Sequence, residues 1–179
     1  MKLFLAPHDD DQILFGCFTL MREKPLTVIC TDSFIQSNRG ENITAQMRAD
    51  ETIAAMKVLN LPFIRLGIRD DIVDDWALRH ALGRFGGFEQ IYAPSEQHGN
   101  KDHDLVGKVA REIFGDKVIQ YSTYAKGEWC TSIGNKIDPT PEEYKLKIKA
   151  LDCYKSQINL PATKGHFDAI KEVGLEWYM

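Results

Sequence analysis

The sequence predicts an α/β fold in which helices cover both faces of a mostly parallel β-sheet. Short apolar runs alternate along the chain with amphipathic stretches, which is the pattern of successive βαβ units. Hydrophobic residues make up 44% of the chain and charged residues 27%, as in ordinary globular proteins. The length of 179 residues suits one domain spanning residues 1–179.

The first two apolar runs predict neighbouring strands. Lys2–Ala6 is a short apolar run, and Asp11–Met21 after it has a helical pattern that ends before Pro25. Leu26–Thr31 is rich in Val, Ile and Thr, which favour strands. The polar stretch Asp32–Asn42 then predicts a loop.

Thr44–Leu59 is the clearest predicted helix. Met47, Ala54, Ala55 and Val58 recur at helical spacing, so we expect them to share one buried apolar face.

The alternation continues through the middle of the chain. Phe63–Gly67, Glu89–Ala93 and Lys117–Tyr124 are predicted strands, and Val73–Arg84 and Asp104–Phe114 are predicted helices. Ligands of such sheets bind outside the carboxyl ends of the strands, so functional residues are expected there.

The last predicted element is a helix with a clear start. Residues 125–140 contain glycine, proline and polar side chains and predict a loop or short hairpin. Thr140–Glu143 matches a capping box with proline at the first helical position, and predicts a helix from Pro141 to about Tyr154.

The end of the first strand carries an unusual concentration of charge. His8 is followed by the consecutive carboxylates Asp9, Asp10 and Asp11. Burying that much negative charge is costly unless a cation neutralises it. His8 and Asp11 are residue types that bind catalytic zinc, whereas the simpler alternative is a polar turn that caps the next helix.

A second polar segment, residues 94–104, follows the fourth predicted strand and reaches the same edge of the sheet. It contains His98 and His103. A third ligand from this segment would leave a fourth metal position for water. Asp10 is then a candidate general base, or else a first-turn helix residue. Without His8, His103 would be read as a surface histidine near a helix capped by Asp102.

Four segments, in order, resemble the LmbE/PIG-L family of zinc-dependent N-deacetylases. Pro7–Gln12 is similar to the family motif PHPDDE, and Gly99–Gly107 is similar to G-H-P-D-H-x-x-V-G. Arg48–Leu59 resembles R-x-x-E-x-x-x-A-A-x-x-L-G. Lys149–Gln157 resembles the last part, A-x-x-x-H-x-S-Q, of the late family helix K-x-x-A-x-x-x-H-x-S-Q.

The resemblance implies a Rossmann-like three-layer sandwich with zinc at the carboxyl ends of the strands. By position, His8, Asp11 and His103 would bind Zn²⁺, although an N/O ligand set accepts other divalent metals. Asp10 would be the general base. Arg48 matches an arginine that lines the active site in relatives, and its alternative role is a solvated charge or an ion pair within its helix.

The chain departs from the family pattern at several positions near the site. Asp9 replaces a proline, Gln12 a glutamate and Tyr154 a histidine that we expect to be structural. Asn100 stands where relatives carry a histidine that assists the transition state or the leaving group. Asparagine can donate a hydrogen bond to an oxyanion but cannot deliver a proton, so His98 is a candidate substitute.

The expected activity is zinc-dependent hydrolysis of an N-acetyl group on an N-acetylglucosamine-type sugar or sugar conjugate, giving acetate and a free amine. One alternative is a metal-containing sugar-binding module without catalysis. Another is a metal-dependent nucleotide-sugar transferase that uses Asp9 and Asp11 as a D-x-D pair.

Composition and sequence pattern also indicate which other partners and which location to expect. The net charge of −4 argues against a protein built to bind nucleic acid, and no apolar run reaches the ~20 residues of a membrane span. The start of the chain lacks the pattern of a signal peptide, so a cytoplasmic location is expected. Cys17 and Cys30 lie in or beside apolar segments and are expected to be buried and reduced. A homo-oligomer is compatible with the sequence.

Overall fold

The computed structural model describes residues 1–32, 34, 42–70, 72–123, 125, 134–173 and 176–178. The strands in this part of the chain are β1 (Lys2–Ala6), β2 (Leu26–Asp32), β3 (Phe63–Arg69), β4 (Gln90–Pro94), β5 (Val118–Tyr121), β6 (Asn135–Ile137) and β7 (Glu176–Tyr178). They form one sheet in the order β3-β2-β1-β4-β5-β7-β6. The first five strands pair in parallel, while β7 pairs antiparallel with β5 and β6.

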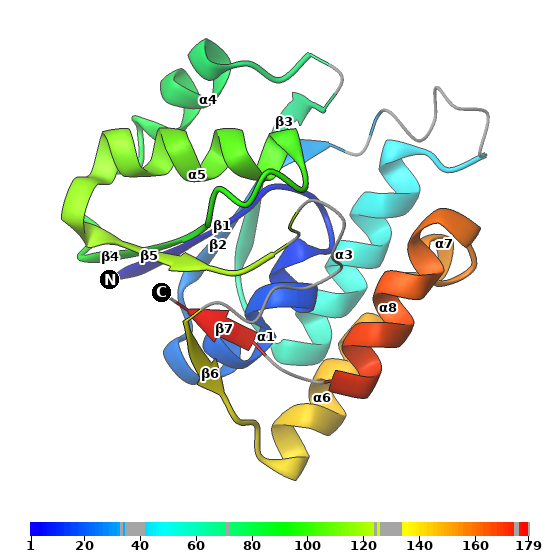
Figure 1. Cartoon of the computed structure of the whole chain (residues 1–179). Coiled ribbons are helices and arrows are strands. Elements are labelled where there is room, and N and C mark those ends of the chain that lie inside the picture. Colours follow the sequence, from blue (N-terminus) through cyan, green and yellow to red (C-terminus); the bar gives the residue numbers. More distant parts are fainter. Residues whose placement is uncertain are drawn as a thin grey trace.

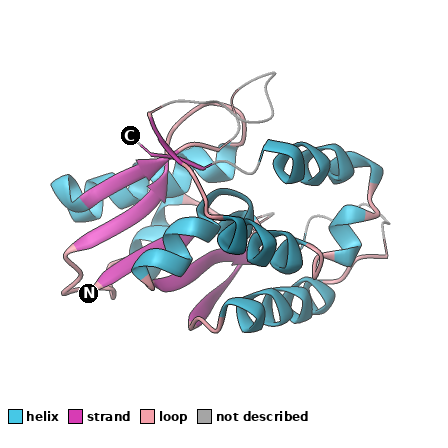
Figure 2. Cartoon of the chain, turned by 90° about the horizontal axis from the view of Figure 1, so that it is seen from below, coloured by secondary structure: helices cyan, strands magenta, loops and turns pink. Residues whose placement is uncertain are grey.

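Helices lie on both sides of this sheet (Figures 1 and 2). They are α1 (Asp11–Glu23), α3 (Ala45–Leu59), α4 (Asp75–Leu82), α5 (Lys101–Phe114), α6 (Pro141–Leu151), α7 (Lys155–Ile158) and α8 (Pro161–Val173), with a 3₁₀ turn over Gly115–Lys117. In Figure 1, α4 and α5 cover one face, and α1, α3, α6 and α8 lie on the other side. The predicted α/β sandwich is therefore confirmed.

Strand β1 separates two hydrophobic cores because its side chains alternate between the faces of the sheet. Leu3 and Leu5 pack in the core beneath α4 and α5. Phe4 and Ala6 pack in the other core, with residues of α1, α3, α6 and α8. A Cβ atom at Gly16 would lie 2.1 Å from the Phe4 ring, so glycine is what allows α1 to approach the sheet this closely.

The structure moves the boundaries of two predicted helices. Helix α5 begins at Lys101 because Asn100 is its N-cap, with Asn100 Oδ1 accepting a hydrogen bond from the Asp102 N–H at 2.9 Å. The expectation that Asp102 would cap this helix is wrong. The capping box at Thr140 is confirmed, but α6 ends at Leu151 rather than at Tyr154.

The predicted apolar face of α3 is confirmed only in part. Ala55 is buried and Val58 packs against the core, whereas Met47 is 43% exposed and Ala54 is exposed as well. The buried positions of this helix include Arg48 and Thr52, whose polar groups contact the loop after β1. The inward face of α3 is therefore partly polar, because its polar side chains contact residues of the candidate site described below.

The sequence analysis missed the last part of the fold. It assigned β6 to a loop or hairpin region and predicted nothing for the segment that forms α8 and β7. Phe167 and Ile170 of α8 are buried in the core that faces α1.

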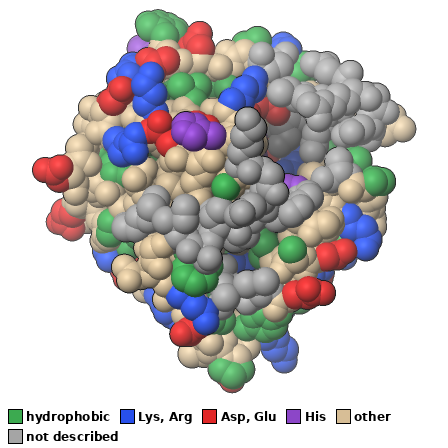
Figure 3. Space-filling model, in the orientation of Figure 1, with side chains coloured by type: hydrophobic (Ala, Val, Ile, Leu, Met, Phe, Trp, Pro, Cys, Tyr) green, Lys and Arg blue, Asp and Glu red, His purple; other side chains and the backbone are tan. Residues whose placement is uncertain are grey.

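Cys17 and Cys30 are buried and free, as expected. Among the described residues, no helix is long and apolar enough to span a membrane. On the face shown in Figure 3, acidic and basic side chains of the described residues are interspersed.

His166 of α8 leads to a prediction about acid stability. Burial lowers the pKa of His166 to about 4, although the Asp11 charge acts to raise it. Between pH 6.5 and pH 4 the unfolded chain then binds more protons than the folded chain, so the free energy of unfolding falls as the pH falls. Between pH 7.5 and pH 5, we expect the free energy of unfolding of His166→Gln to fall by about 1–2 kcal/mol less than that of wild type. This value allows for the partial exposure of the ring.

Urea unfolding of the metal-free protein at pH 7.5 and pH 5 measures this difference. The matched control is His80→Gln, which replaces an exposed histidine. An equal pH dependence in wild type and His166→Gln would contradict the prediction.

Candidate metal and catalytic site

The candidate site is built from two loops at the carboxyl edge of the sheet. The first joins β1 to α1 and carries His8, Asp9 and Asp10, with Asp11 as the first residue of α1. The second follows β4, and His103 lies in the first turn of α5. Asp10 occupies the N-cap of α1, but its side chain makes no capping hydrogen bond. The simple capping interpretation of the acidic segment therefore fails for Asp10.

His8, Asp11 and His103 converge as the sequence predicted. His8 Nδ1 lies 3.1 Å from Asp11 Oδ2, His103 Nε2 lies 3.1 Å from the same oxygen, and the two nitrogens are 3.3 Å apart. Three donors bound at about 2.0 Å to a tetrahedral ion are separated by about 3.3 Å, so this donor set fits zinc. The fit rests on the spacing and the chemistry of the donors.

Asp102 orients His8 from the far side of the ring. His8 Nε2 lies 3.0 Å from Asp102 Oδ2, while Nδ1 faces the other two donor atoms. A carboxylate on the second ring nitrogen fixes the tautomer of a metal-binding histidine. The sequence analysis gave Asp102 no such role, although its position beside His103 was a usable signal.

The charges within the cluster shift two pKa values. Burial acts to lower the pKa of His8, but hydrogen bonds with Asp102 and Asp11 hold it well above its usual value. Burial acts to raise the pKa of Asp11, but the His103 and His8 imidazoles hold it far below its usual range. A metal would have to displace the proton from His8 Nδ1, so protons and metal compete for this site.

Asp10 is turned towards Arg48 of α3. Arg48 Nη2 lies 3.0 Å from Asp10 Oδ1, and the Arg48 side chain is 2% exposed. Burial raises the pKa of Asp10, and the Arg48 guanidinium opposes that rise. Arg48 Nη1 also lies 3.7 Å from Glu51 Oε2, and the guanidinium lies 5.6 Å from the centre of the Tyr154 ring. Arg48 is therefore a buried partner of Asp10 and not a solvated helix charge.

Asp9 faces away from the three candidate metal ligands. Its carboxylate pairs with Arg65 of β3. Arg65 Nε lies 3.0 Å from Asp9 Oδ1, and Arg65 Nη2 lies 3.0 Å from Asp9 Oδ2. The three consecutive aspartates thus have separate partners: Asp9 pairs with Arg65, Asp10 with Arg48, and Asp11 with the two histidines. This division explains how the segment buries so much negative charge.

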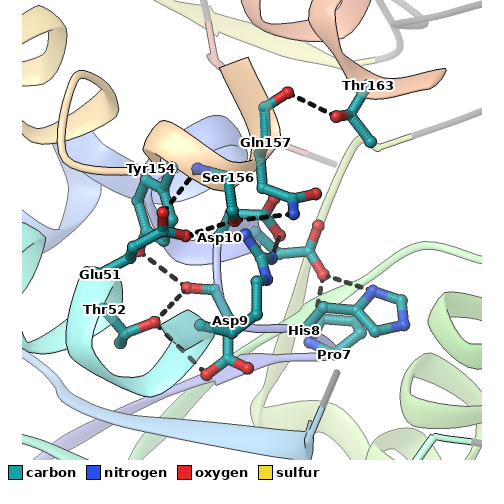
Figure 4. Close-up of polar contacts among 12 residues, drawn as sticks. Pro7, His8, Asp9, Asp10, Glu51, Thr52, Tyr154, Ser156, Gln157 and Thr163 are labelled. Atoms are coloured by element: carbon teal, nitrogen blue, oxygen red, sulfur yellow. Dashed lines mark hydrogen bonds and ion pairs between the residues drawn. The ribbon is translucent and has the colours of Figure 1, made fainter. Parts of the chain in front are cut away.

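Residues 154–156 of the late segment that resembles the family contact the same region. Tyr154 donates a hydrogen bond from its hydroxyl to the Asp9 carbonyl at 2.7 Å (Figure 4). Ser156 donates its backbone N–H and its hydroxyl to the two Glu51 oxygens at 2.6 and 2.7 Å. Two of the resembling segments therefore join each other, and Tyr154 has the structural role expected from the sequence.

Asn100 and His98 lie beside the site with other partners. The side-chain oxygen of Asn100 caps α5, so its amide nitrogen is the end that could donate to an oxyanion. The His98 side chain is 80% exposed, and its Nδ1 lies 3.6 Å from Asp104 Oδ2. His98 also has a left-handed backbone with φ of 59°.

Comparison with known proteins identifies the fold. No family model matches the sequence, and none of the curated proteins compared with it matches. The N,N′-diacetylchitobiose deacetylase from Pyrococcus horikoshii aligns with a TM-score of 0.71 and 17% identity, over 99% of this chain and 80% of that one. The A40926 pseudoaglycone deacetylase aligns with a TM-score of 0.75 and 14% identity, over 96% of this chain and 89% of that one. This chain shares the fold of the LmbE/PIG-L deacetylases.

The fold is not confined to deacetylases. The 4-carboxy-2-hydroxymuconate hydratase from Pseudomonas putida KT2440 aligns with a TM-score of 0.61 and 16% identity, over 97% of this chain and 90% of that one. The fold by itself therefore does not select between amide hydrolysis and another reaction that uses water. The choice between these reactions therefore depends on the residues of the site.

Proposed function

We propose that this protein hydrolyses the N-acetyl group of an N-acetylglucosamine-type sugar or sugar conjugate, with a divalent metal as cofactor. One observation carries the proposal: donor atoms of His8, Asp11 and His103 lie 3.1–3.3 Å apart at the carboxyl edge of the sheet. Asp10 directly precedes Asp11 and has its own cationic partner. The solved structures with this fold include an N,N′-diacetylchitobiose deacetylase and an A40926 pseudoaglycone deacetylase, which supports the substrate class.

The metal has a limited and defined role in the proposal. Zinc would polarise the amide carbonyl and lower the pKa of water towards about 7. His8, Asp11 and His103 would hold it, and Asp102 would keep His8 in the tautomer that presents Nδ1. The same N/O ligand set would also accept another divalent metal.

Asp10 is assigned both proton transfers. Its carboxylate accepts a proton from the water whose oxygen attacks the carbonyl carbon. As the C–N bond breaks, the same proton passes to the amine nitrogen, giving acetate and a free amine. Arg48 holds the carboxylate in place and favours its ionised form, opposing the effect of burial on the Asp10 pKa. Asn100 would donate to the oxyanion, and the exposed His98 is not needed in this path.

The transferase alternative is weakened by one contact. A D-x-D metal site needs the Asp9 and Asp11 carboxylates on the same ion. The Asp9 carboxylate is instead fully buried and held by two bonds from Arg65. A sugar-binding module without catalysis would keep the metal and fail to release acetate, so the same assay separates it from a deacetylase.

The proposal is tested by acetate release from a panel of N-acetylated sugars with metal-free and zinc-loaded protein. We expect chelation to abolish release and one equivalent of zinc to restore it. Zinc should be titrated from below one equivalent, because a teicoplanin deacetylase with this fold has a zinc-inhibited form. His103→Ala should lose one of three protein ligands, bind zinc at least about tenfold more weakly and stay inactive at one equivalent.

His80→Ala is the matched control, because His80 is an exposed histidine. Full activity in the chelated protein, or unchanged zinc binding by His103→Ala, would contradict the proposal. Zinc binding without acetate release across the panel would favour a binding module or a hydratase-like reaction.

A further inference from the structure

We propose that the Asp9–Arg65 pair is a positioning device that fixes the backbone of the loop from His8 to Asp11. The inference rests on the proposed function, because it assigns the pair the task of setting where the metal ligands lie.

The Asp9 carboxylate is held across two neighbouring strands. Asp9 is 0% exposed, and Arg65 of β3 reaches it with two parallel bonds of 3.0 Å. Arg65 Nη2 also lies 3.0 Å from Asp32 Oδ1 at the end of β2. Two parallel bonds between a planar guanidinium and a carboxylate fix orientation as well as distance. Arg65 therefore links the loop after β1 to both β2 and β3.

The Asp9 carbonyl oxygen is held just as firmly. It accepts hydrogen bonds from Gln12 Nε2 at 2.9 Å, from the Thr52 hydroxyl at 2.8 Å and from the Tyr154 hydroxyl at 2.7 Å. The labelled contacts of Asp9 with Thr52 and Tyr154 are visible in Figure 4. This oxygen belongs to the peptide plane that leads to Asp10, so the donors restrict rotation of that plane. Carboxylate and carbonyl together fix the residue between His8 and Asp10.

A gain in folding stability does not by itself explain why Asp9 and Arg65 form a buried ion pair. A buried ion pair seldom contributes more than well-packed apolar residues of the same volume, because both charges lose their hydration. A third negative charge beside Asp10 and Asp11 also adds repulsion. The LmbE/PIG-L motif has proline at this position, where the ring fixes the backbone covalently. In this chain, hydrogen bonds and an ion pair supply the rigidity.

The test compares Arg65→Met with the double variant Asp9→Asn/Arg65→Met. Arg65→Met leaves a buried carboxylate without its guanidinium, so we expect a lower melting temperature. We also expect loop amides of the metal-free protein to exchange hydrogen at least about tenfold faster, and zinc to bind about 10–100-fold more weakly. The double variant removes the unpaired charge and should recover most of the melting temperature. It should recover neither slow exchange nor zinc affinity.

Arg22→Met is the matched control. It removes another two-bond arginine–carboxylate pair, between Arg22 and Glu143, with both bonds at 2.7 Å. This control should leave loop exchange and zinc affinity unchanged. Recovery of all three properties in the double variant would overturn the inference, since the pair would then only compensate charge. If wild type failed to bind zinc, the proposed function would fail, while hydrogen exchange in the metal-free protein would still decide the inference.

Discussion

Replacing Asp10 with asparagine is expected to lower kcat by about 10²–10⁴-fold while the protein still binds one zinc ion. Asparagine has nearly the same shape and keeps an oxygen that can accept from Arg48 Nη2, which lies 3.0 Å from Asp10 Oδ1. It cannot accept and return a proton at neutral pH. The donor atoms of His8, Asp11 and His103 are unchanged, so metal binding should survive.

A double variant sharpens this test. Arg48→Met should lower kcat on its own, because the Asp10 carboxylate loses the group that orients it. In the Asp10→Asn protein the same change should cost little more, since the proton acceptor is already lost. Asp168→Asn, an exposed carboxylate change on α8, serves as the control. A zinc-loaded Asp10→Asn protein with kcat within tenfold of wild type would rule out the assigned role.

Local sequence patterns predicted the parallel part of the fold and the closeness of the candidate metal ligands for the same reason. Apolar runs of five or six residues predicted β1 to β4, and the pattern needs no knowledge of distant residues. Because parallel strands end at one edge, His8 after β1 and His103 after β4 were expected to meet. Their donor atoms lie 3.3 Å apart.

Contacts between distant parts of the chain had no such local signal. Arg65 lies in a strand 56 positions from Asp9, and nothing in either segment alone indicates the pair. Arg48 and Thr52 are polar residues on a helix, where exposure is the usual expectation. They are buried because Asp10 and Asp9 provide their partners. The hydrophobic pattern therefore found Ala55 and Val58 but missed the buried polar residues of α3.

The C-terminal strand was missed because it is short and its key residue is charged. β7 has three residues, and Glu176 in it is 1% exposed. A buried glutamate contradicts the apolar pattern of a core strand. Its partner is Lys147 of α6, which is also fully buried, with Lys147 Nζ 2.9 Å from Glu176 Oε1.

Replacing Lys147 with methionine is expected to lower the free energy of unfolding by about 3–5 kcal/mol. The change leaves the Glu176 carboxylate buried without its cation. It also removes the donor to the Leu14 carbonyl, which accepts from Lys147 Nζ at 2.9 Å. Glu176 accepts the backbone N–H of Phe18 at 2.9 Å, so the pair joins the end of the sheet to the middle of α1. For a chain of this size the melting temperature should fall by about 6–20 °C.

The double variant Lys147→Met/Glu176→Gln separates unpaired charge from lost hydrogen bonds. Glutamine is neutral and its oxygen can still accept from the Phe18 N–H, so most of the lost stability should return. About 1–2 kcal/mol should remain lost, because the Leu14 carbonyl still lacks its donor. Urea unfolding of both variants measures these values, and Lys164→Met, at an exposed pair with Asp168, should change stability by less than about 0.5 kcal/mol. A loss below about 1 kcal/mol in Lys147→Met would mean that water or a neighbouring group replaces the lysine. The buried pair would then not be what holds β7 against α1, the helix that begins with the candidate metal ligand Asp11.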